Sequence, residues 1–321
     1  KLLINTTNTL PILNNGPYIL AFHGVTDNKN PVLNKHLHLD VDLFIEIINF
    51  FNKNFDISDI DELSKSDFSF KKNKLYLTFD DGYKNNLENV APILKNLSLP
   101  WAMFISPYHI DNKKKLPTFY SNLASKYLQK KKYHFNSLES SIDFSNKNIN
   151  KYLKKILNYN SLSKSREFLN ELISLMKQQD VYKEKDKYLD DNLLNWEEIN
   201  FLVDSYNLTI GSHSYYHIPL SQDKSEEFIF SELNKSKISI NKNKISTKLF
   251  AYPNGGTKDV SKLAFKALKK ENFDIAFTMW QKNYKKNQPK YLIPRISISS
   301  IKDFKYNNYK FLIDKSYNLF G

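Results

Sequence analysis

Short apolar runs recur along the chain, and segments with helical spacing separate them. Their lengths and their apolar positions are typical of buried strands. In chain order they are Tyr18–Phe22, Phe55–Ser58, Leu75–Phe79, Trp101–Ile105, Leu208–Gly211, Thr247–Tyr252, Asp274–Thr278 and Tyr291–Ile298. One predicted helix begins near Asp40. Four others span Asn85–Leu97, Trp196–Tyr206, Phe228–Ile240 and Val260–Lys270, and a closing helix is predicted at Phe304–Phe320. Pro92 is a weak point inside the second of them.

This alternation of strand and helix predicts the fold. Strands that alternate with helices form a parallel sheet, because each helix carries the chain back across one face of the sheet. We therefore expect an α/β fold, a distorted (β/α) barrel of about seven to eight parallel strands. By length the 321 residues form one large domain or two small ones, and we expect a single domain over residues 1–321.

Residues 111–195 break the alternation. This segment has clusters of Lys, no Gly, and amphipathic helical patterns at Tyr120–Leu128, Tyr152–Leu157 and Phe168–Met176. It contains no cluster of metal-type side chains. We expect a helical insertion into the barrel that shapes access to the functional site.

Polar side chains directly follow two of the predicted strands. Asp80 and Asp81 come after Leu75–Phe79, and His23 comes after Tyr18–Phe22. The C-terminal ends of parallel strands are the edge at which α/β folds bind ligands and metals. Adjacent aspartates before a glycine are also common in turns, so this pattern alone leaves a turn and a functional site equally open.

Two histidines, His213 and His217, follow the strand Leu208–Gly211. Their spacing is that of metal ligands, because one helical turn would place both imidazoles on one side. The alternative is a pair of capping or surface histidines in a loop. Together with Asp81 they would supply two neutral imidazoles and one carboxylate, which leaves coordination positions open for water and substrate. Hydrolytic and oxidative metal sites have this form.

The composition narrows the range of functions. Cys is absent, which excludes disulfides and thiolate metal sites. No apolar run approaches the ~20 residues of a membrane span, so we expect no transmembrane segment. The start of the chain lacks the apolar middle of a signal peptide, and we favour the cytoplasm over the periplasm or cell envelope. A removed leader stays open, because the chain does not begin with Met.

The net charge of +13 would suit nucleic acid, an anionic glycan or a membrane surface. The excess is nearly all Lys, scattered beside abundant Asn and Ile, which indicates a compositional habit. We therefore expect no nucleic-acid partner. Arg166 and Arg295 are the only arginines, and each is of interest because a guanidinium forms bidentate contacts that an ammonium cannot.

Three motifs, in order, resemble those of the polysaccharide deacetylases, carbohydrate esterase family 4 with the NodB homology domain. A helix that opens Trp196-Glu197-Glu198 introduces the second motif, as it does in such proteins. The third resembles the variant found in biofilm-polysaccharide deacetylases. The matching residues are Thr78-Phe79-Asp80-Asp81-Gly82, His213-Ser214-Tyr215-Tyr216-His217 and Phe250-Ala251-Tyr252-Pro253-Asn254-Gly255. The resemblance covers about residues 18–110 and 195–300, and the insertion lies outside it.

The resemblance implies a metal-dependent hydrolase that removes N-acyl groups, by preference N-acetyl, from an amino sugar in a polysaccharide or glycan precursor. Asp81, His213 and His217 would hold the metal, and Asp80 would be the general base. A ligating carboxylate must stay ionised on the cation, whereas its neighbour remains free to take a proton from bound water. Zn²⁺ is the default for these ligands, and Mn²⁺, Co²⁺ or Ni²⁺ would also fit.

The same resemblance assigns substrate binding to Tyr252, Pro253 and Asn254, near which a backbone N–H would stabilise the oxyanion. Many family members have Arg in place of Ala251, where it orients the base. Arg295 could supply the same bidentate guanidinium contact from another strand, and a structural ion pair is its alternative role. Asn254 replaces an aromatic residue that is common at this place in the family.

The usual late general acid of the family is missing, because no His follows His217. In biofilm-type deacetylases that His lies on the first strand, where His23 stands, and we favour His23 over His109 as the acid. The other histidines, His36, His38 and His134, are expected to be ordinary loop or surface residues.

Two rival functions use the same residues. A non-haem Fe(II) oxygenase has the same ligand set, usually on antiparallel double-sheet folds, so the predicted α/β alternation argues against it. A barrel that binds carbohydrate without metal or catalysis is the other. We expect an N-acylated amino-sugar glycan as the partner, and the lysines of the insertion would suit an anionic one.

Overall fold

A central parallel sheet organises the computed structural model, which describes residues 17–65, 73–282, 284–285 and 287–298. Eight strands run in the order β12-β11-β10-β9-β6-β5-β1-β13, and β4 pairs with the start of β5. The strands of this sheet are β1 (Tyr18–Phe22), β4 (Asp56–Ile57), β5 (Lys74–Asp80), β6 (Trp101–Ile105), β9 (Leu208–Ser212), β10 (Leu249–Ala251), β11 (Ile275–Thr278), β12 (Ile293–Pro294) and β13 (Ile296–Ser297). The predicted parallel strands are confirmed.

One short segment nearly closes this sheet into a barrel. Ile293 of β12 pairs with Phe277 of β11, and Ile296 of β13 pairs with Leu20 of β1. The two outer edges of the sheet are therefore held by residues on either side of Arg295. The prediction of one strand over Tyr291–Ile298 was wrong, because this segment forms two short strands: β12 pairs with β11, and β13 pairs with β1. The predicted distorted (β/α) barrel is confirmed.

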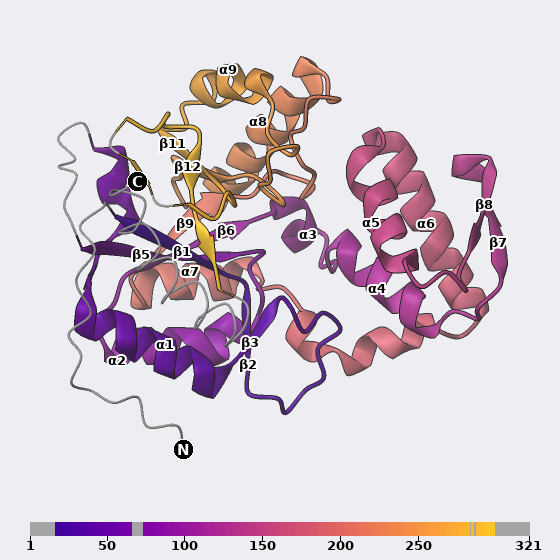
Figure 1. Cartoon of the computed structure of the whole chain (residues 1–321), viewed down its shortest axis with the longest axis horizontal. Coiled ribbons are helices and arrows are strands. Elements are labelled where there is room, and N and C mark those ends of the chain that lie inside the picture. The colour runs from indigo at the N-terminus through magenta and orange to yellow at the C-terminus, as the bar shows by residue number, and fades with distance from the viewer. Residues whose placement is uncertain (1–16, 66–72, 283, 286, 299–321) are drawn as a thin grey trace, which may run out of the picture.

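Helices cover the barrel on both sides. The helices next to the sheet are α1 (Val41–Asn54), α2 (Ala91–Asn96), α3 (Pro107–Asp111), α7 (Trp196–Ser205), α8 (Glu226–Lys242) and α9 (Lys262–Lys270). In Figure 1, α1, α2 and α7 lie below the sheet and α8 and α9 lie above it. Strand residues are buried on both faces, by the helices outside the barrel and by one another inside it. Phe22 packs against Phe44 of α1, whereas Ile19, on the other face of β1, belongs to the cluster of mostly strand residues around Phe104.

Local sequence explains where these helices begin. Asp40 caps α1, its carboxylate accepting hydrogen bonds from the backbone N–H groups of Asp42 and Leu43. The helix predicted over Asn85–Leu97 begins instead as a π-helical turn, Asn86–Val90, and continues as α2. Pro92 stands in the first turn of α2, where its missing N–H needs no partner.

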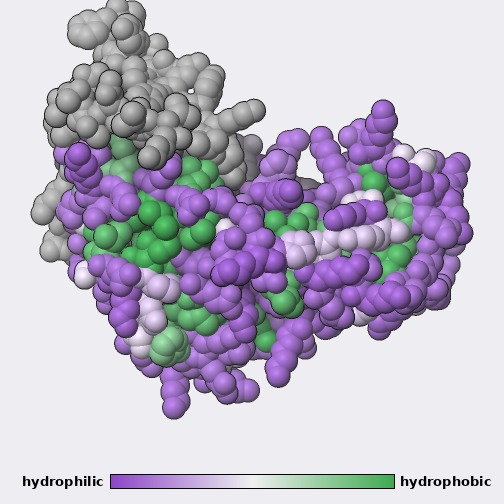
Figure 2. Space-filling model, turned by 90° about the horizontal axis from the view of Figure 1, so that it is seen from below, coloured by the Kyte–Doolittle hydropathy of each residue, from purple (hydrophilic) through white to green (hydrophobic). Residues whose placement is uncertain are grey.

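Residues 111–195 form a body beside the barrel with an apolar cluster of its own. It contains α4 (Pro117–Tyr127), α5 (Ile149–Tyr159) and α6 (Leu162–Gln178), which project to the right in Figure 1. On the face shown in Figure 2 its surface is mostly hydrophilic. None of its strands joins the barrel sheet.

The expectation of helical structure throughout the insertion was wrong. The strands β7 (Lys132–Phe135) and β8 (Ser140–Asp143) pair in an antiparallel hairpin. Most of their side chains are exposed and polar, so the hairpin has little of the apolar alternation by which strands are found in a sequence. Two short 3₁₀ helices, Tyr182–Lys187 and Leu189–Asp191, lead back to the barrel.

A second small parallel pair, β2 (Gly24–Thr26) and β3 (His38–Asp40), follows β1. It buries His38, whose assignment as an ordinary loop or surface residue was therefore wrong. His36 and His134 are exposed, as expected. The closing helix predicted at Phe304–Phe320 lies outside the described residues. Within the described part of the chain, no helix has both the length and the apolarity needed to cross a membrane.

Candidate metal centre and active site

The polar residues at the strand ends meet in one cavity of about 190 Å³. Asp80 ends β5, and His23 follows β1 directly. Because these two parallel strands pair with Phe22 opposite Phe79, the residues that follow them emerge side by side. His213 and His217, which follow β9, line the same cavity with Asp81.

Asp81, His213 and His217 form a buried cluster with the donor atoms of a metal site. One ligand atom from each lies within 4.8 Å of the others. Asp81 Oδ1 is 3.0 Å from His217 Nε2 and 3.8 Å from His213 Nε2. This carboxylate oxygen is buried and accepts no hydrogen bond in the described structure. An unsatisfied oxygen facing two imidazole nitrogens fits a divalent cation.

The protein backbone orients His213 for this role. Its Nδ1 donates a hydrogen bond to the carbonyl oxygen of Ala251 at 2.7 Å, which leaves the lone pair of Nε2 on the side of Asp81. Burial lowers the pKa of His213 to about 4, so its imidazole is neutral, as metal binding requires. Burial also acts on His217, but the facing Asp81 outweighs it and raises the pKa of that histidine.

Three residues at this cavity have backbone conformations that favour glycine. Asp81 has φ of 76°, His217 of 56° and Asn254 of 59°. Left-handed backbone at a residue other than glycine costs of order 1 kcal/mol or more, and it persists only where the surrounding structure holds it. Such residues cluster at functional sites, which agrees with the chemistry of these side chains.

Arg295 holds Asp80 through both oxygens of its carboxylate. Its two terminal nitrogens donate to Asp80 Oδ1 and Oδ2, each at 2.7 Å, and one of them also donates to Thr78 Oγ1 at 3.1 Å. The side chain of Arg295 is fully buried. Burial alone would raise the pKa of Asp80, but the charge of Arg295 and its hydrogen bonds outweigh burial and hold that pKa below its usual range.

Glu232 of α8 positions the loop between the two histidines, a role that sequence reasoning missed. Its carboxylate accepts hydrogen bonds from the backbone N–H groups of Tyr215 at 3.1 Å and Tyr216 at 2.9 Å. Burial raises the pKa of Glu232 to about 7. In the sequence it is one of several charged residues on an amphipathic helix, and only the fold shows that it faces inward.

The two histidines considered as proton donors lie in different environments. His23 lines the cavity beside Asp80 and Asp81. His109 of α3 is buried, does not line that cavity, and has its Nε2 3.3 Å from the carbonyl oxygen of Tyr216. Burial lowers the pKa of His109 to about 4, which leaves it neutral. The geometry therefore favours His23.

The third motif contributes mainly through Asn254. The side chain of Tyr252 is fully buried, and its N–H donates to the carbonyl oxygen of Phe277 at 3.0 Å. Pro253 has no N–H to offer. Asn254 is exposed, lines the cavity, and has a backbone N–H without an acceptor in the described structure. Of the three predicted residues, it is the one with a donor available to a ligand.

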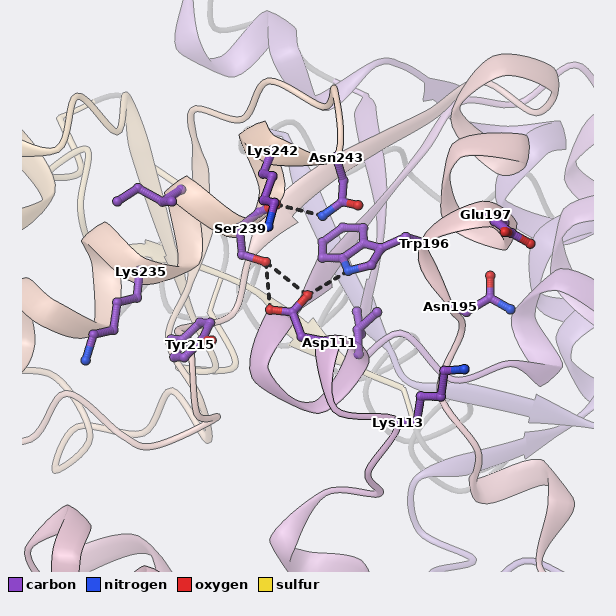
Figure 3. Close-up of a pocket in the computed structure, with 12 residues that line it drawn as sticks. Asp111, Lys113, Asn195, Trp196, Glu197, Tyr215, Lys235, Ser239, Lys242 and Asn243 are labelled. Atoms are coloured by element: carbon purple, nitrogen blue, oxygen red, sulfur yellow. Dashed lines mark hydrogen bonds between the residues drawn. The ribbon is translucent and has the colours of Figure 1, made fainter.

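A larger cavity of about 720 Å³ lies outside the barrel, between α3, α7 and α8. Figure 3 shows Asp111 at its centre, with hydrogen bonds from Trp196 Nε1 at 2.8 Å and from Ser239 Oγ at 2.9 Å. None of the predicted catalytic or metal-binding residues lines it. Its central carboxylate is satisfied by neighbouring donors, and the described residues that could hold a metal lie elsewhere, so size alone does not make it the active site.

Comparisons with known proteins agree with this geometry. The sequence model of a family described as polysaccharide deacetylase matches residues 68–276. No curated protein matches the sequence. The deacetylase PplD of Streptococcus pyogenes, solved in complex with acetate, has a similar structure (TM-score 0.57, 13% identity, covering 91% of this chain and 98% of PplD).

Two further solved structures share the fold. They are IcaB from Ammonifex degensii (TM-score 0.57, 15% identity, covering 92% of this chain and 97% of IcaB) and a de-N-acetylase from Aggregatibacter actinomycetemcomitans (TM-score 0.55, 13% identity, covering 90% and 98%). At these identities the likeness concerns the fold. The family match extends from before β5 into β11 and includes the residues that form the buried cluster. The chain therefore belongs to the polysaccharide deacetylase family.

Proposed function

We propose that this protein is a metal-dependent hydrolase that removes N-acyl groups, by preference N-acetyl, from an amino sugar in a polysaccharide or glycan precursor. The observation that carries the proposal is the pairing of two adjacent carboxylates with different partners. Asp81 faces two imidazoles, whereas Asp80 is held by Arg295. Amide hydrolysis needs this division between a ligand and a base.

Asp81, His213 and His217 would hold the metal. When bound, the metal would acidify a water molecule and polarise the acyl carbonyl. Zn²⁺ is the default for two imidazoles and one carboxylate, and Mn²⁺, Co²⁺ or Ni²⁺ would fit the same ligands. The residues of the chain then have to bind the amide, take one proton from the attacking water and return one to the departing amine.

Asp80 is suited to take the proton from water. Its low pKa keeps it ionised, and each carboxylate oxygen has a second lone pair beyond the one bonded to Arg295. The N–H of Asn254 is the available backbone donor for the oxyanion that develops on the acyl oxygen. His23 lines the same cavity and would give a proton to the amine nitrogen as the C–N bond breaks.

The rival functions fit the structure less well. The parallel barrel differs from the antiparallel double sheets on which the Fe(II) oxygenase ligand set usually occurs. An oxygenase would also have no need of a second carboxylate fixed by a buried arginine. A barrel without catalysis would have little reason to keep a carboxylate that faces two imidazoles beside another that is held by a buried arginine.

Substitution of single residues separates metal binding from catalysis. We expect Asp81→Asn, His213→Ala and His217→Ala to lose the metal, and Asp80→Asn to keep it while turnover of an N-acetylated oligosaccharide falls ~10²–10⁴-fold. Elemental analysis gives the metal content, and detection of released acetate gives the rate. Stoichiometric metal in all three ligand variants would refute the metal site, and near-normal turnover by Asp80→Asn would refute the base.

A further inference from the structure

The insertion contributes part of the wall of the catalytic cavity. Thr118 of α4 and Lys154 and Asn158 of α5 line it together with the metal-site residues. Lys154 and Asn158 are one helical turn apart, so they share a face of α5. Because α4 and α5 pack on the apolar cluster of the insertion, this wall is built independently of the barrel strands.

The donor groups on this wall have no partner in the described structure. Neither the ammonium of Lys154, the amide of Asn158 nor the hydroxyl of Thr118 forms a hydrogen bond or ion pair with another described residue. Asn158 is only 8% exposed. The side-chain donors of these residues are not among the buried polar atoms that lack a partner, so they are reached from the cavity that they line. A ligand in the cavity can therefore supply an acceptor to them.

The charges around the cavity indicate what that partner is. Lys154 is the only Lys or Arg among the residues that line it, and the carboxylates of Asp80 and Asp81 face Arg295 and the histidines. Burial lowers the pKa of Lys154, with no carboxylate near enough to oppose this. A partly desolvated ammonium without a counter-ion is stabilised most by an anion.

We propose that Thr118, Lys154 and Asn158 form an oxyanion-binding subsite, which takes a carboxylate or phosphate carried by the sugar that is deacylated. This inference rests on the function proposed above. The three donors line the same cavity as Asp80, Asp81 and the metal-site histidines. The anionic group therefore belongs to the same sugar as the N-acyl group or to its immediate linkage.

Kinetics with matched sugars tests the subsite. The substrates are N-acetylglucosamine, its 1-phosphate, its 6-phosphate and its C6 carboxylate, each with wild type and Lys154→Met. We expect wild type to prefer at least one charged sugar by about 10- to 100-fold in kcat/KM, the range of a charge-assisted hydrogen bond, and Lys154→Met to lose that preference. Lys155→Met, which changes the exposed neighbouring lysine, should keep it.

The three charged sugars distinguish the possible sources of the anionic group. A preference for the C6 carboxylate would identify the substrate as an acidic glycan, and a preference for a phosphate would identify it as a sugar phosphate. Either result supports the subsite. Equal kcat/KM for all four sugars, or a preference that survives in Lys154→Met, would overturn it.

Binding measured by calorimetry separates this inference from the proposed function. If none of the sugars is hydrolysed, tighter binding of a charged sugar by wild type than by Lys154→Met still supports the subsite. The proposed function fails separately, if wild type releases no acetate from the N-acetylated oligosaccharide either. Asn158→Asp is a second variant, because it places a carboxylate one turn from Lys154 and should weaken binding of the charged sugar about tenfold. Unchanged binding by Asn158→Asp would contradict the subsite.

Discussion

Arg295 shows how one residue fixes the chemistry of another. Its guanidinium bonds both oxygens of Asp80, and it lies where β12 and β13 meet, so the segment that closes the barrel also orients Asp80, the proposed base. The family resemblance would place an arginine for this purpose at the position of Ala251. Here Arg295 holds the carboxylate from a different part of the chain, and we propose that it is a positioning residue for Asp80.

We expect Arg295→Lys to lower kcat about 100-fold and leave the metal content unchanged, because one ammonium cannot hold both carboxylate oxygens. As the pH is lowered, the variant should lose activity at a higher pH than wild type does, because loss of the bidentate contact raises the pKa of Asp80. The pH profile of kcat/KM checks this. Arg166→Lys is the matched control, and an acid limb that stays in place would argue for a purely structural role.

We expect His23→Ala to keep the metal, to lose most activity toward an amide, and to be much less impaired toward an activated ester. The amine that leaves an amide needs a proton, whereas the leaving group of an activated ester does not. Rates on both substrates, with exposed His36→Ala as the control, decide the point. Equal losses would indicate positioning, and full amide turnover would return the role of acid to His109.

At the scale of elements, the insertion is tied to the barrel at both of its sides. Asp190 and Asp191, at the end of the insertion, bond the segment around β2 and β3: Asp191 accepts from Leu33 N–H at 2.8 Å and lies 3.3 Å from His38 Nε2. Arg166 of α6 lies over the ring of Tyr216, in the loop between the two histidines. The insertion therefore contacts the elements that surround the active site.

Loss of Asp191 should destabilise the protein without removing the metal. Asp191→Ala leaves the Leu33 N–H and the buried His38 without their acceptor, and each unsatisfied group costs about 1–3 kcal/mol. We therefore expect the free energy of unfolding in urea to fall by about 2–4 kcal/mol. Asp186→Ala removes an exposed carboxylate of the same segment and should change it by less than about 1 kcal/mol. A similar stability for both variants would refute the role of Asp191.

At the scale of the whole molecule, stability depends on pH through Glu232. Its pKa is raised from 4.5 to about 7 by burial, so between these values the folded protein keeps a proton that the unfolded chain has released. The contribution of Glu232 is therefore most favourable below pH 4.5, and it is lost as pH rises toward 7. The contribution of Glu232 to the unfolding free energy should fall by up to roughly 3 kcal/mol across this interval. His109 and His213, whose pKa burial lowers to about 4, act in the opposite direction, so the contribution of Glu232 is the difference between wild type and Glu232→Gln.

Glu232→Gln should remove this dependence, because an amide does not titrate. The measurement is urea unfolding at pH 5 and pH 8 in the presence of a chelator, so that pH-dependent metal binding does not contribute. Glu227→Gln, on the exposed side of the same helix, should retain the wild-type dependence. An identical dependence in Glu232→Gln and wild type would show that other groups cause it.

The sequence by itself determined most strands of the central sheet, the barrel that they form, and the residues at the strand ends. Apolar periodicity is local, and the C-terminal ends of parallel strands share one edge, so Asp81, His213 and His217 could be placed together from their positions in the chain alone. The family resemblance then supplied roles that spacing alone left open.

Only the tertiary structure decided which distant residues hold these groups in place. Asp80 and Arg295 are 215 positions apart, and no local pattern links them. Glu232, His38 and Lys154 resemble ordinary surface residues in the sequence, because the side of an element that becomes buried depends on what packs against it. The exposed hairpin of the insertion was missed for the converse reason: with little apolar surface to bury, it left no pattern in the sequence.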